Sequence, residues 1–342
     1  MRWSHLPLAI KISAGIGLVL VLLMALGWQS FSGITQIVDN GVEVISGNKL
    51  RGNILKREVD HLNWGGQVGA FINDANITEL EVQLDPSRCA FGQWYYGEGR
   101  REAERLVPAL APLLQRVEAP HSALHASAGE IKKVMRRADP HLPGFLAQKE
   151  ADHLAWSENV LGAIVSQQTR LGVELNPRQC GFGKFLYGDT GRSMAAGDAE
   201  LARLLSAVEP VHARLHQLGS QVGEALARGD TAAAAALYRD SVTPTLKETR
   251  ELLHAMQQRA QDNLKGKQQA ELIFARQTQQ HLGELQELFH SMNDAVEKGV
   301  MTEDTMIERA VSTRESVATW ALFALVLGVL SAWIITRSIT RP

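Results

Sequence analysis

The chain divides into two uncharged apolar runs and a long amphipathic region between them. Residues 12–28 and 318–335 contain no Asp, Glu, Lys or Arg. A helix needs about 20 mostly apolar residues to cross the hydrocarbon layer, with a lower limit near 17, so both runs predict transmembrane helices. Each run has Trp near an end, where its ring suits the membrane interface. A cleaved signal peptide is the alternative for the first run, but no clear small-x-small cleavage site follows it, and we favour an uncleaved span.

The region between the runs, 29–317, favours an all-α structure. It lacks alternating β-branched runs and is rich in Ala, Leu, Glu, Gln and Arg, which are strong helix formers. Apolar residues recur at helical spacing through 245–319, which has no proline and predicts one helix of about 110 Å leading into the second span. The proline-free stretch 29–84 predicts a matching outgoing helix. We therefore expect a membrane-anchored antiparallel stalk that could pair with a second copy.

Basic residues at the outer flanks of the two runs predict the topology. Arg2 and Lys11 precede the first run, and Arg337 and Arg341 follow the second. Lys11 is expected to reach outward to the interface. The positive-inside rule then places both termini in the cytoplasm of a bacterial inner membrane and 29–317 in the periplasm.

Composition narrows the function classes. The chain has 35 Lys+Arg against 37 Asp+Glu, a formal net charge of −2, which argues against a nucleic-acid binder because such proteins carry a basic excess. Its two cysteines exclude a disulfide-stapled scaffold. We find no Gly-rich phosphate loop and no notable Ser-His-Asp order, so we expect no enzyme in this chain.

An internal repeat carries the candidate chemistry. The offset between copies is 92 residues for the first block and 91 for the other two, which brings six histidines and both cysteines into register. The repeated blocks are 60–64 (DHLNW) and 152–156 (DHLAW), 89–97 (CAFGQWYYG) and 180–188 (CGFGKFLYG), and 121–125 (HSALH) and 212–216 (HARLH).

The histidine pair of each copy has the spacing of metal ligands on a helix. His121 and His125 are four residues apart, so their imidazoles share one helix face, and the same spacing recurs in the second copy. Pro120 and Pro210 lie just before these pairs, where we expect a first-turn proline to begin each helix.

Each cysteine follows an Asx-Pro pair that predicts a helix start. Asp85 precedes Cys89 and Asn176 precedes Cys180, each by four residues. The Asx side chain is expected to cap the helix and the proline to take its first position. A thiol just inside a helix N-terminus favours the thiolate through the macrodipole.

One thiolate and three imidazoles form a tetrahedral set that suits Zn²⁺ better than Mg²⁺ or Ca²⁺. A disulfide between the two cysteines is the alternative in an oxidising compartment, but it would not require a matching histidine trio for each cysteine. We predict two zinc ions per chain. The predicted ligands are His61, Cys89, His121 and His125 in one site, and His153, Cys180, His212 and His216 in the other.

The motif series D-H-x-x-W, C-x-F-G-x-(W/F)-x-Y-G and H-x-x-x-H resembles the chemoreceptor zinc-binding (CZB) domain. The resemblance covers 55–138 and 148–228, about half of the chain. It implies two tandem four-helix units, each with a three-His, one-Cys zinc site on the residues above, as found in bacterial chemotaxis receptors and some diguanylate cyclases. Phe185 and Leu186 depart from the Trp-Tyr pair of the first copy. The family is often cytoplasmic, which is a second departure.

The last residues, 337–342 (RSITRP), resemble the start of a HAMP linker, which implies a signalling domain beyond this chain. The predicted organisation is a cytoplasmic N-terminus (1–11), a first span (12–28), an outgoing stalk (29–54), the first unit (55–138), the second unit (148–228), a returning stalk helix (229–317), a second span (318–335) and the linker start (336–342).

These observations predict the sensor portion of a homodimeric chemotaxis receptor that senses zinc or oxidants. Its cytoplasmic signalling partners would be reached through a missing C-terminal output domain. The alternative is structural zinc in a receptor for another ligand, feeding a diguanylate cyclase or a histidine kinase.

Overall fold

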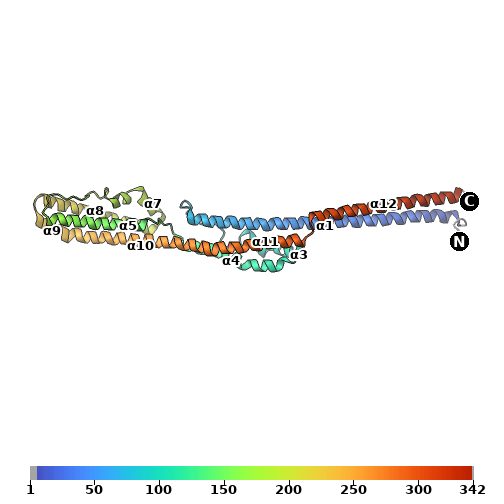
Figure 1. The fold of residues 1–342 in the computed structure, drawn as a ribbon, viewed down its shortest axis with the longest axis horizontal. Coiled ribbons are helices and arrows are strands. Elements are labelled where there is room, and N and C mark those ends of the chain that lie inside the picture. Colours follow the sequence, from blue (N-terminus) through green and yellow to red (C-terminus); the bar gives the residue numbers. More distant parts are fainter. Residues whose placement is uncertain (1–5, 341–342) are drawn as a thin grey trace. The chain divides into compact units, whose positions relative to one another are not determined.

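The computed structural model describes residues 6–340, which are helical without strands, as predicted (Figure 1). Arg2, His5 and Arg341 lie outside the described residues. The helices of the described chain are α1 (Leu8–Asn73), α2 (Ala90–Tyr96), α3 (Glu98–Leu106), α4 (Leu110–Val134), α5 (Leu142–Val165), α6 (Gly181–Leu186), α7 (Asp189–Gly197), α8 (Ala199–Ala227), α9 (Thr231–Leu237), the π-helical turn η2 (Tyr238–Val242), α10 (Thr243–Ile273), the π-helical turn η3 (Phe274–Thr278), α11 (Gln279–Gly299) and α12 (Glu303–Thr340).

The chain forms two compact units. The first combines the chain up to Gly65 with Gln83–His125 and with the chain from Gln280 onward. The second combines Gly66–Val82 with Ala126–Gln279, and in it α5, α8 and α10 pack into a bundle. Fully buried apolar side chains of α5, α8 and α10 fill this bundle, among them Val160, Leu215 and Met256.

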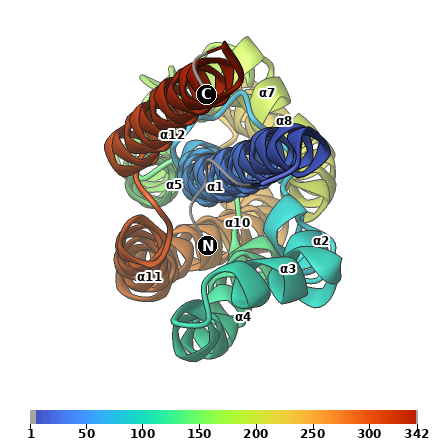
Figure 2. The ribbon, with the colours of Figure 1, turned by 90° about the vertical axis from the view of Figure 1, so that its right-hand side faces the viewer.

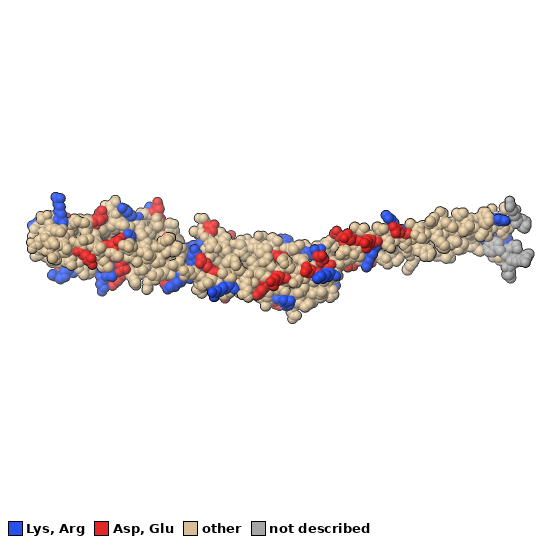
Figure 3. Space-filling view, viewed as in Figure 1, with Lys and Arg blue, Asp and Glu red and all other residues tan. Residues whose placement is uncertain are grey.

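In the first unit, α1 and α12 lie side by side (Figure 2). A side chain at Gly15 would collide with Ile335, so the two helices approach closely there. Both helices are long and apolar enough to cross a membrane by length and composition, and Figure 3 shows almost no charge over their paired apolar runs. Lys11 is buried and donates to Ser338 Oγ at 2.8 Å. Ser338 lies beyond the second apolar run, and the reach of Lys11 to the interface stays a prediction.

The outgoing helix predicted for 29–84 is present, but α1 ends at Asn73. The single helix predicted for 245–319 is wrong, because the chain leaves helical geometry at 300–302. There the Met301 N–H donates to Glu43 Oε1 at 2.8 Å, so a side chain takes the place of a helical carbonyl. Thr302 Oγ1 then accepts the N–H of Thr305 and starts α12.

Pro120 and Pro210 do not begin helices, which corrects the sequence prediction. Each lies in the interior of a longer helix, α4 or α8. An interior proline removes one backbone hydrogen bond and costs about 3 kcal/mol. Buried side chains on both sides of the proline hold the helix together, as Val117 and Leu124 do in α4, both with no exposed surface.

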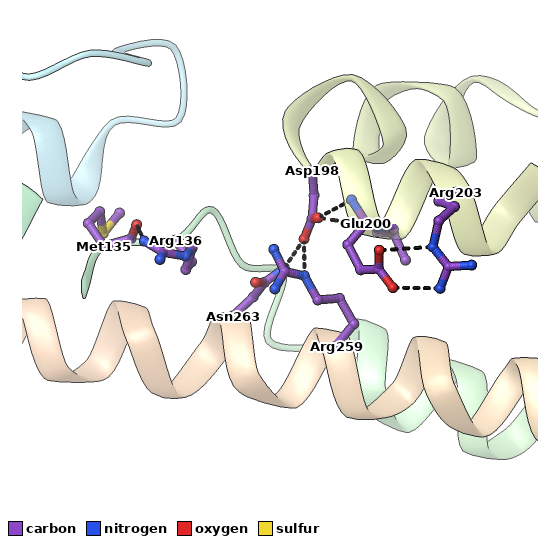
Figure 4. Close-up of polar contacts among 8 residues, drawn as sticks. Met135, Arg136, Asp198, Glu200, Arg203, Arg259 and Asn263 are labelled. Carbon is purple, nitrogen blue, oxygen red and sulfur yellow. Dashed lines mark hydrogen bonds and ion pairs between the residues drawn. The ribbon is translucent and has the colours of Figure 1, made fainter. Parts of the chain in front are cut away.

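The start of α8 is tied to α10 by one carboxylate, Asp198 (Figure 4). Its Oδ1 accepts the N–H of Glu200 and of Leu201, which makes it the N-cap of α8. Its Oδ2 accepts from Arg259 Nε at 2.8 Å and from Asn263 Nδ2. Burial acts to raise the pKa of this carboxyl, but the hydrogen bonds from Arg259, Asn263 and Leu201 outweigh it and lower the pKa to about 2.

We predict that Asp198→Asn destabilises the second unit by about 2 kcal/mol at pH 7. The amide keeps the helix cap but loses the charge facing Arg259, and a carboxyl pKa lowered from 3.8 to about 2 corresponds to about that free energy at 1.36 kcal/mol per pH unit. The stabilisation is complete above pH 3.8 and disappears as the pH falls towards 2.

Urea unfolding of wild type and variants across this pH range measures the effect. Asp189→Asn is the matched control, because Asp189 pairs with Arg192 on the fully exposed surface and should change stability little. Equal losses in the two variants would contradict the assignment.

Candidate metal centres

The first cluster gathers side chains from three segments of the first unit. His61 comes from α1, Cys89 from the turn before α2, and His121 and His125 from successive turns of α4. Their four donor atoms all lie within 4.8 Å of one another. Cys89 Sγ is 3.3 Å from His121 Nε2. The three imidazoles are at most 4% exposed, so the donors converge in a protected space.

The second cluster repeats this arrangement inside the second unit. His153 comes from α5, Cys180 from the turn before α6, and His212 and His216 from α8. The donor atoms again lie within 4.8 Å of one another, and Cys180 Sγ is 3.3 Å from His212 Nε2. Every residue proposed from the repeat is therefore brought together with the other members of its own copy.

The disulfide between the two cysteines, the alternative to metal binding, is not formed. Both thiols are free and belong to different clusters, so the disulfide hypothesis is wrong. His290 contacts Glu58 at 3.0 Å, outside both clusters. Asp60 and Asp152 face lysines on the surface, as in the pair between Lys56 and Asp60, and do not orient the neighbouring histidines.

Backbone carbonyls fix the tautomers of the histidines. His61 Nδ1 lies 2.7 Å from the Arg57 carbonyl oxygen, and His125 Nδ1 lies 2.9 Å from that of Gln83. A carbonyl only accepts, so each Nδ1 must carry the hydrogen and each Nε2 presents a lone pair to the cluster. In the second cluster, His153 and His216 make the equivalent contacts, with the carbonyl oxygens of Lys149 and Glu174.

The lone pairs on the histidine Nε2 atoms show whether a metal ion would fit each cluster. The Nε2 atoms of His61, His125, His153 and His216 are buried and have no hydrogen-bond partner. A buried unsatisfied polar atom costs about 1–3 kcal/mol, and here several acceptors face each other without a donor. A cation resolves the conflict, and three nitrogens with one sulfur match the tetrahedral preference of Zn²⁺. When bound, such an ion supplies a charged centre that holds the four side chains together.

The electrostatics of the clusters keep the imidazoles neutral. Burial, reinforced by the neighbouring histidines, lowers the pKa of His121 and of His212 to about 3. Burial also lowers the pKa of His125 and of His216 to about 4, against the opposing effect of their carbonyl hydrogen bonds. Neutral imidazole is the form that ligates a metal, so the imidazoles of both clusters are already in the binding protonation state near pH 7.

The cysteines differ from the prediction in both position and protonation. Cys89 is itself the N-cap of α2, with Sγ accepting the Gly92 N–H at 3.2 Å, while Asp85 closes a turn onto Ser87 instead of capping the helix. Burial raises the pKa of the Cys89 thiol and outweighs the lowering by the N–H groups of Gly92 and Phe91. The thiolate expected from the macrodipole therefore requires the charge of a bound metal.

The glycine of the C-x-F-G motif allows this turn to form. A Cβ at Gly92 would collide with the carbonyl oxygen of Pro86, and one at Gly183 would collide with that of Pro177. The backbone of each short helix thus approaches the preceding turn closely enough for its N–H to reach Sγ. Only glycine permits that approach.

Sequence reasoning missed the carbonyls of Gln83 and Glu174. Trp64 Nε1 donates to the Gln83 oxygen at 2.9 Å, and Trp156 Nε1 donates to that of Glu174 at 2.8 Å. Each tryptophan of the D-H-x-x-W motif therefore holds the carbonyl that orients the last histidine of its cluster. Gln83 and Glu174 share the 91-residue offset of the repeat, which is the signal that could have found them, although no side-chain chemistry marks a backbone oxygen.

The helices that cover the two clusters differ. In the first copy, Glu58 contacts His290 of α11 at 3.0 Å. In the second copy, the equivalent residue Glu150 contacts Arg250 of α10 at 2.9 Å. His290 and Arg250 therefore occupy equivalent places, and a residue of α11 corresponds to the residue of α10 that lies 40 positions earlier in the sequence. Phe289 then corresponds to Thr249, and both side chains are buried.

Phe289 packs its ring 5.9 Å from that of His61 and 5.3 Å from that of Phe91. At the corresponding place, Thr249 returns its hydroxyl to the Thr245 carbonyl oxygen. The first cluster thus has an aromatic cover that the second lacks.

Two segments of the chain, residues 61–132 and 153–222, match the sequence model of the chemoreceptor zinc-binding domain. These segments contain all eight predicted ligands, one complete set in each. No curated protein and no solved structure matches the chain. The chain therefore carries two tandem domains of a zinc-binding type, and its two clusters could hold two zinc ions.

We predict that Cys89→Ser and Cys180→Ser each lower the zinc content of the purified chain from two ions to about one, and that the double variant retains almost none. A hydroxyl is a poor zinc ligand compared with a thiolate. Metal analysis after gel filtration measures the content. Ser87→Ala, a hydroxyl change two residues from Cys89, is the control and should keep both ions. Two retained ions in the double variant would exclude thiolate ligation.

We also predict that zinc leaves the second cluster faster than the first, because an aromatic cover limits water access and helix opening at the first. Phe289→Thr should speed release from the first cluster by about tenfold or more, and Thr249→Ala should change release from the second only slightly. Zinc transfer to a chromogenic chelator in single-site cysteine variants reports each rate. Equal rates at both wild-type sites would contradict the role of the cover.

Proposed function

We propose that this chain is the sensor portion of a bacterial chemotaxis or signal-transduction receptor that holds zinc in two three-His, one-Cys sites. The observation that carries the proposal is the pair of buried donor sets within segments that match the chemoreceptor zinc-binding domain. Four protein donors fill all the positions of tetrahedral zinc and leave none for water, unlike catalytic zinc. This supports a binding role and not an enzymatic one.

We place the chain in the bacterial inner membrane as a two-pass protein. Two helices of sufficient length and hydropathy support this placement, and basic residues outside both apolar runs favour cytoplasmic termini. The region between the runs would then lie in the periplasm, which differs from the usual cytoplasmic location of such domains. The HAMP-like end would pass the signal to an output domain and its cytoplasmic partners.

A homodimer is the second element of the proposal. An exposed apolar stripe follows α1 beyond its first apolar run, with each residue more than half exposed: Phe31, Ile34, Val38, Val42 and Ile45. Steps of three and four residues place these side chains on one helix face. A second copy of the same helix would cover the stripe.

Two signals are compatible with these sites: zinc occupancy and oxidation of a zinc-bound cysteine. In the second, hypochlorous acid transfers its oxygen to the thiolate, giving sulfenic acid and chloride. The sulfur is oxidised and chlorine is reduced, and the weakened ligand releases its helix. A structural role for zinc, in a receptor for another ligand with a diguanylate cyclase or histidine kinase output, is the competing function.

We predict that Cys89→Ala with Cys180→Ala abolishes the cellular response to hypochlorous acid. Cells expressing the receptor are compared with cells carrying Ser87→Ala, and swimming reversals are recorded after addition of oxidant or of a mild zinc chelator. A full oxidant response in the double variant would eliminate cysteine sensing. A response to chelation alone supports zinc occupancy as the signal, and silence to both, with unfolding under strong chelation, supports structural zinc.

A further inference from the structure

A groove of about 540 Å³ lies in the first unit, between α1 and the segment that contains α2 and α3. Ser46, Lys49, Leu50 and Asn53 form its α1 wall, and residues from 94–106 form the opposite wall. The lining includes none of the eight metal-site residues. The volume falls in the range of small-molecule sites, which is about 300–1,000 Å³.

The second copy of the repeat fills the equivalent place with an aromatic ring. Asn53 corresponds to Phe145 at the 92-residue offset, and Trp94 corresponds to Phe185 at the 91-residue offset. In the second unit, the ring of Phe145 lies 5.0 Å from that of Phe185. In the first unit, Asn53 contributes no ring, and the groove opens beside Trp94.

Neighbouring residues show that the two α1 and α5 positions are structurally equivalent. The residues three before and one after this position are Leu50 and Ile54 in the first copy and Leu142 and Leu146 in the second, and all four are buried. Both helices therefore present the same face to the bundle. The difference lies in the side chain alone, which leaves space for a ring in the first copy.

The polar groups beside this space are unused by the described residues. Trp94 Nε1 donates to none of them, whereas Trp64 Nε1 donates to the Gln83 carbonyl oxygen. The side-chain amide of Asn53 likewise makes no hydrogen bond within the described chain. Trp94 and Asn53 are both only partly buried, so their polar atoms remain open to a ligand in the groove.

The charges of the groove favour an anion. Lys49 and Arg105 are exposed, line the groove and form no ion pair with a described residue. By contrast, Arg100 and Arg101 of α3 each pair with a glutamate of the same helix. Glu102 is the one carboxylate in the lining, so two cations against one anion leave a single positive charge. Ammonium and guanidinium groups make strong charge-assisted hydrogen bonds to carboxylates.

We propose that this groove binds an aromatic monocarboxylate. The ring of the ligand packs against Trp94, in the place that the Phe145 ring occupies in the second unit. Its carboxylate accepts hydrogen bonds from Lys49 and Arg105. Aromatic pairs are favourable at centroid separations of about 4.5–7 Å, a range that includes the Phe145–Phe185 pair. The groove gives the chain a chemical input that involves no metal ligand.

Isothermal titration of the zinc-loaded full chain in detergent tests the proposal with phenylacetate, against blanks in the same detergent. Acetate lacks the ring and 2-phenylacetamide lacks the charge, so each should bind at least about tenfold more weakly than phenylacetate. Cyclohexylacetate keeps the size and charge but lacks the aromatic ring, and should bind at least about threefold more weakly. Absence of heat with phenylacetate at millimolar concentration overturns the proposal, as does equal binding of all four probes.

Two arginines of α3 provide a matched pair of variants. Arg105→Gln should weaken phenylacetate binding at least about tenfold, because it removes one charged donor. Arg101→Gln should leave the affinity unchanged, since Arg101 pairs with Glu98 and does not line the groove. Equal affinity in the two variants overturns the assignment of the carboxylate.

Asn53→Phe should abolish binding, because it places in the groove the ring that the second unit has at this position. Phe145 packs there without disturbing the second bundle, so the variant is expected to fold. Unchanged affinity in Asn53→Phe overturns the site. Zinc content is measured on every sample. A chain that keeps two ions but ignores phenylacetate refutes the groove alone, whereas one that binds phenylacetate without zinc refutes the metal proposal alone.

Discussion

The structure depends on the convergence of lone pairs inside two helical bundles. In each cluster, three imidazoles and a thiol come from three separate segments, and carbonyl contacts aim Nε2 of two of the imidazoles at the centre. Such an arrangement is unfavourable without a cation, because buried acceptors without donors are costly. With a cation, the same geometry links helices that are distant in sequence. The helices around each cluster are therefore arranged for a metal, and their packing alone does not account for the buried polar atoms.

The ligands could be predicted from the sequence because metal binding needs side-chain types at fixed spacing, and the repeat doubled the signal. The cysteine conformation could not be predicted, since it depends on Gly92 approaching the Pro86 carbonyl, a contact between backbone atoms. The interior position of Pro120 was missed for a related reason. Local preference favours proline in the first turn of a helix. Around Pro120, however, side chains on both sides of the proline are buried, and their packing keeps the helix continuous through Pro120.

The all-α fold and the course of α1 followed from composition and periodicity, while the returning helix did not. Gly299 and the sequence Thr302-Glu303-Asp304 are helix-end and N-cap signals, but no proline is present, and the apolar periodicity that continues past them favoured one helix. The interruption arises from tertiary contacts with α1. Val300 packs where a side chain on Gly47 would stand, and Glu43 takes the N–H of Met301.

The interruption at 300–302 changes how a signal would leave the first cluster. A movement of α11 would have to cross the non-helical residues 300–302 before it reached the apolar run of α12. In contrast, α1 is one continuous helix from His61 to the first apolar run, so a shift at His61 is carried along a single hydrogen-bonded helix. The contacts of Glu43 and Gly47 then pass that shift across to the start of α12. Coupling between distant sites is carried by rigid secondary elements, so α1, and not the returning helix, is the stronger mechanical link between the first cluster and the two apolar runs.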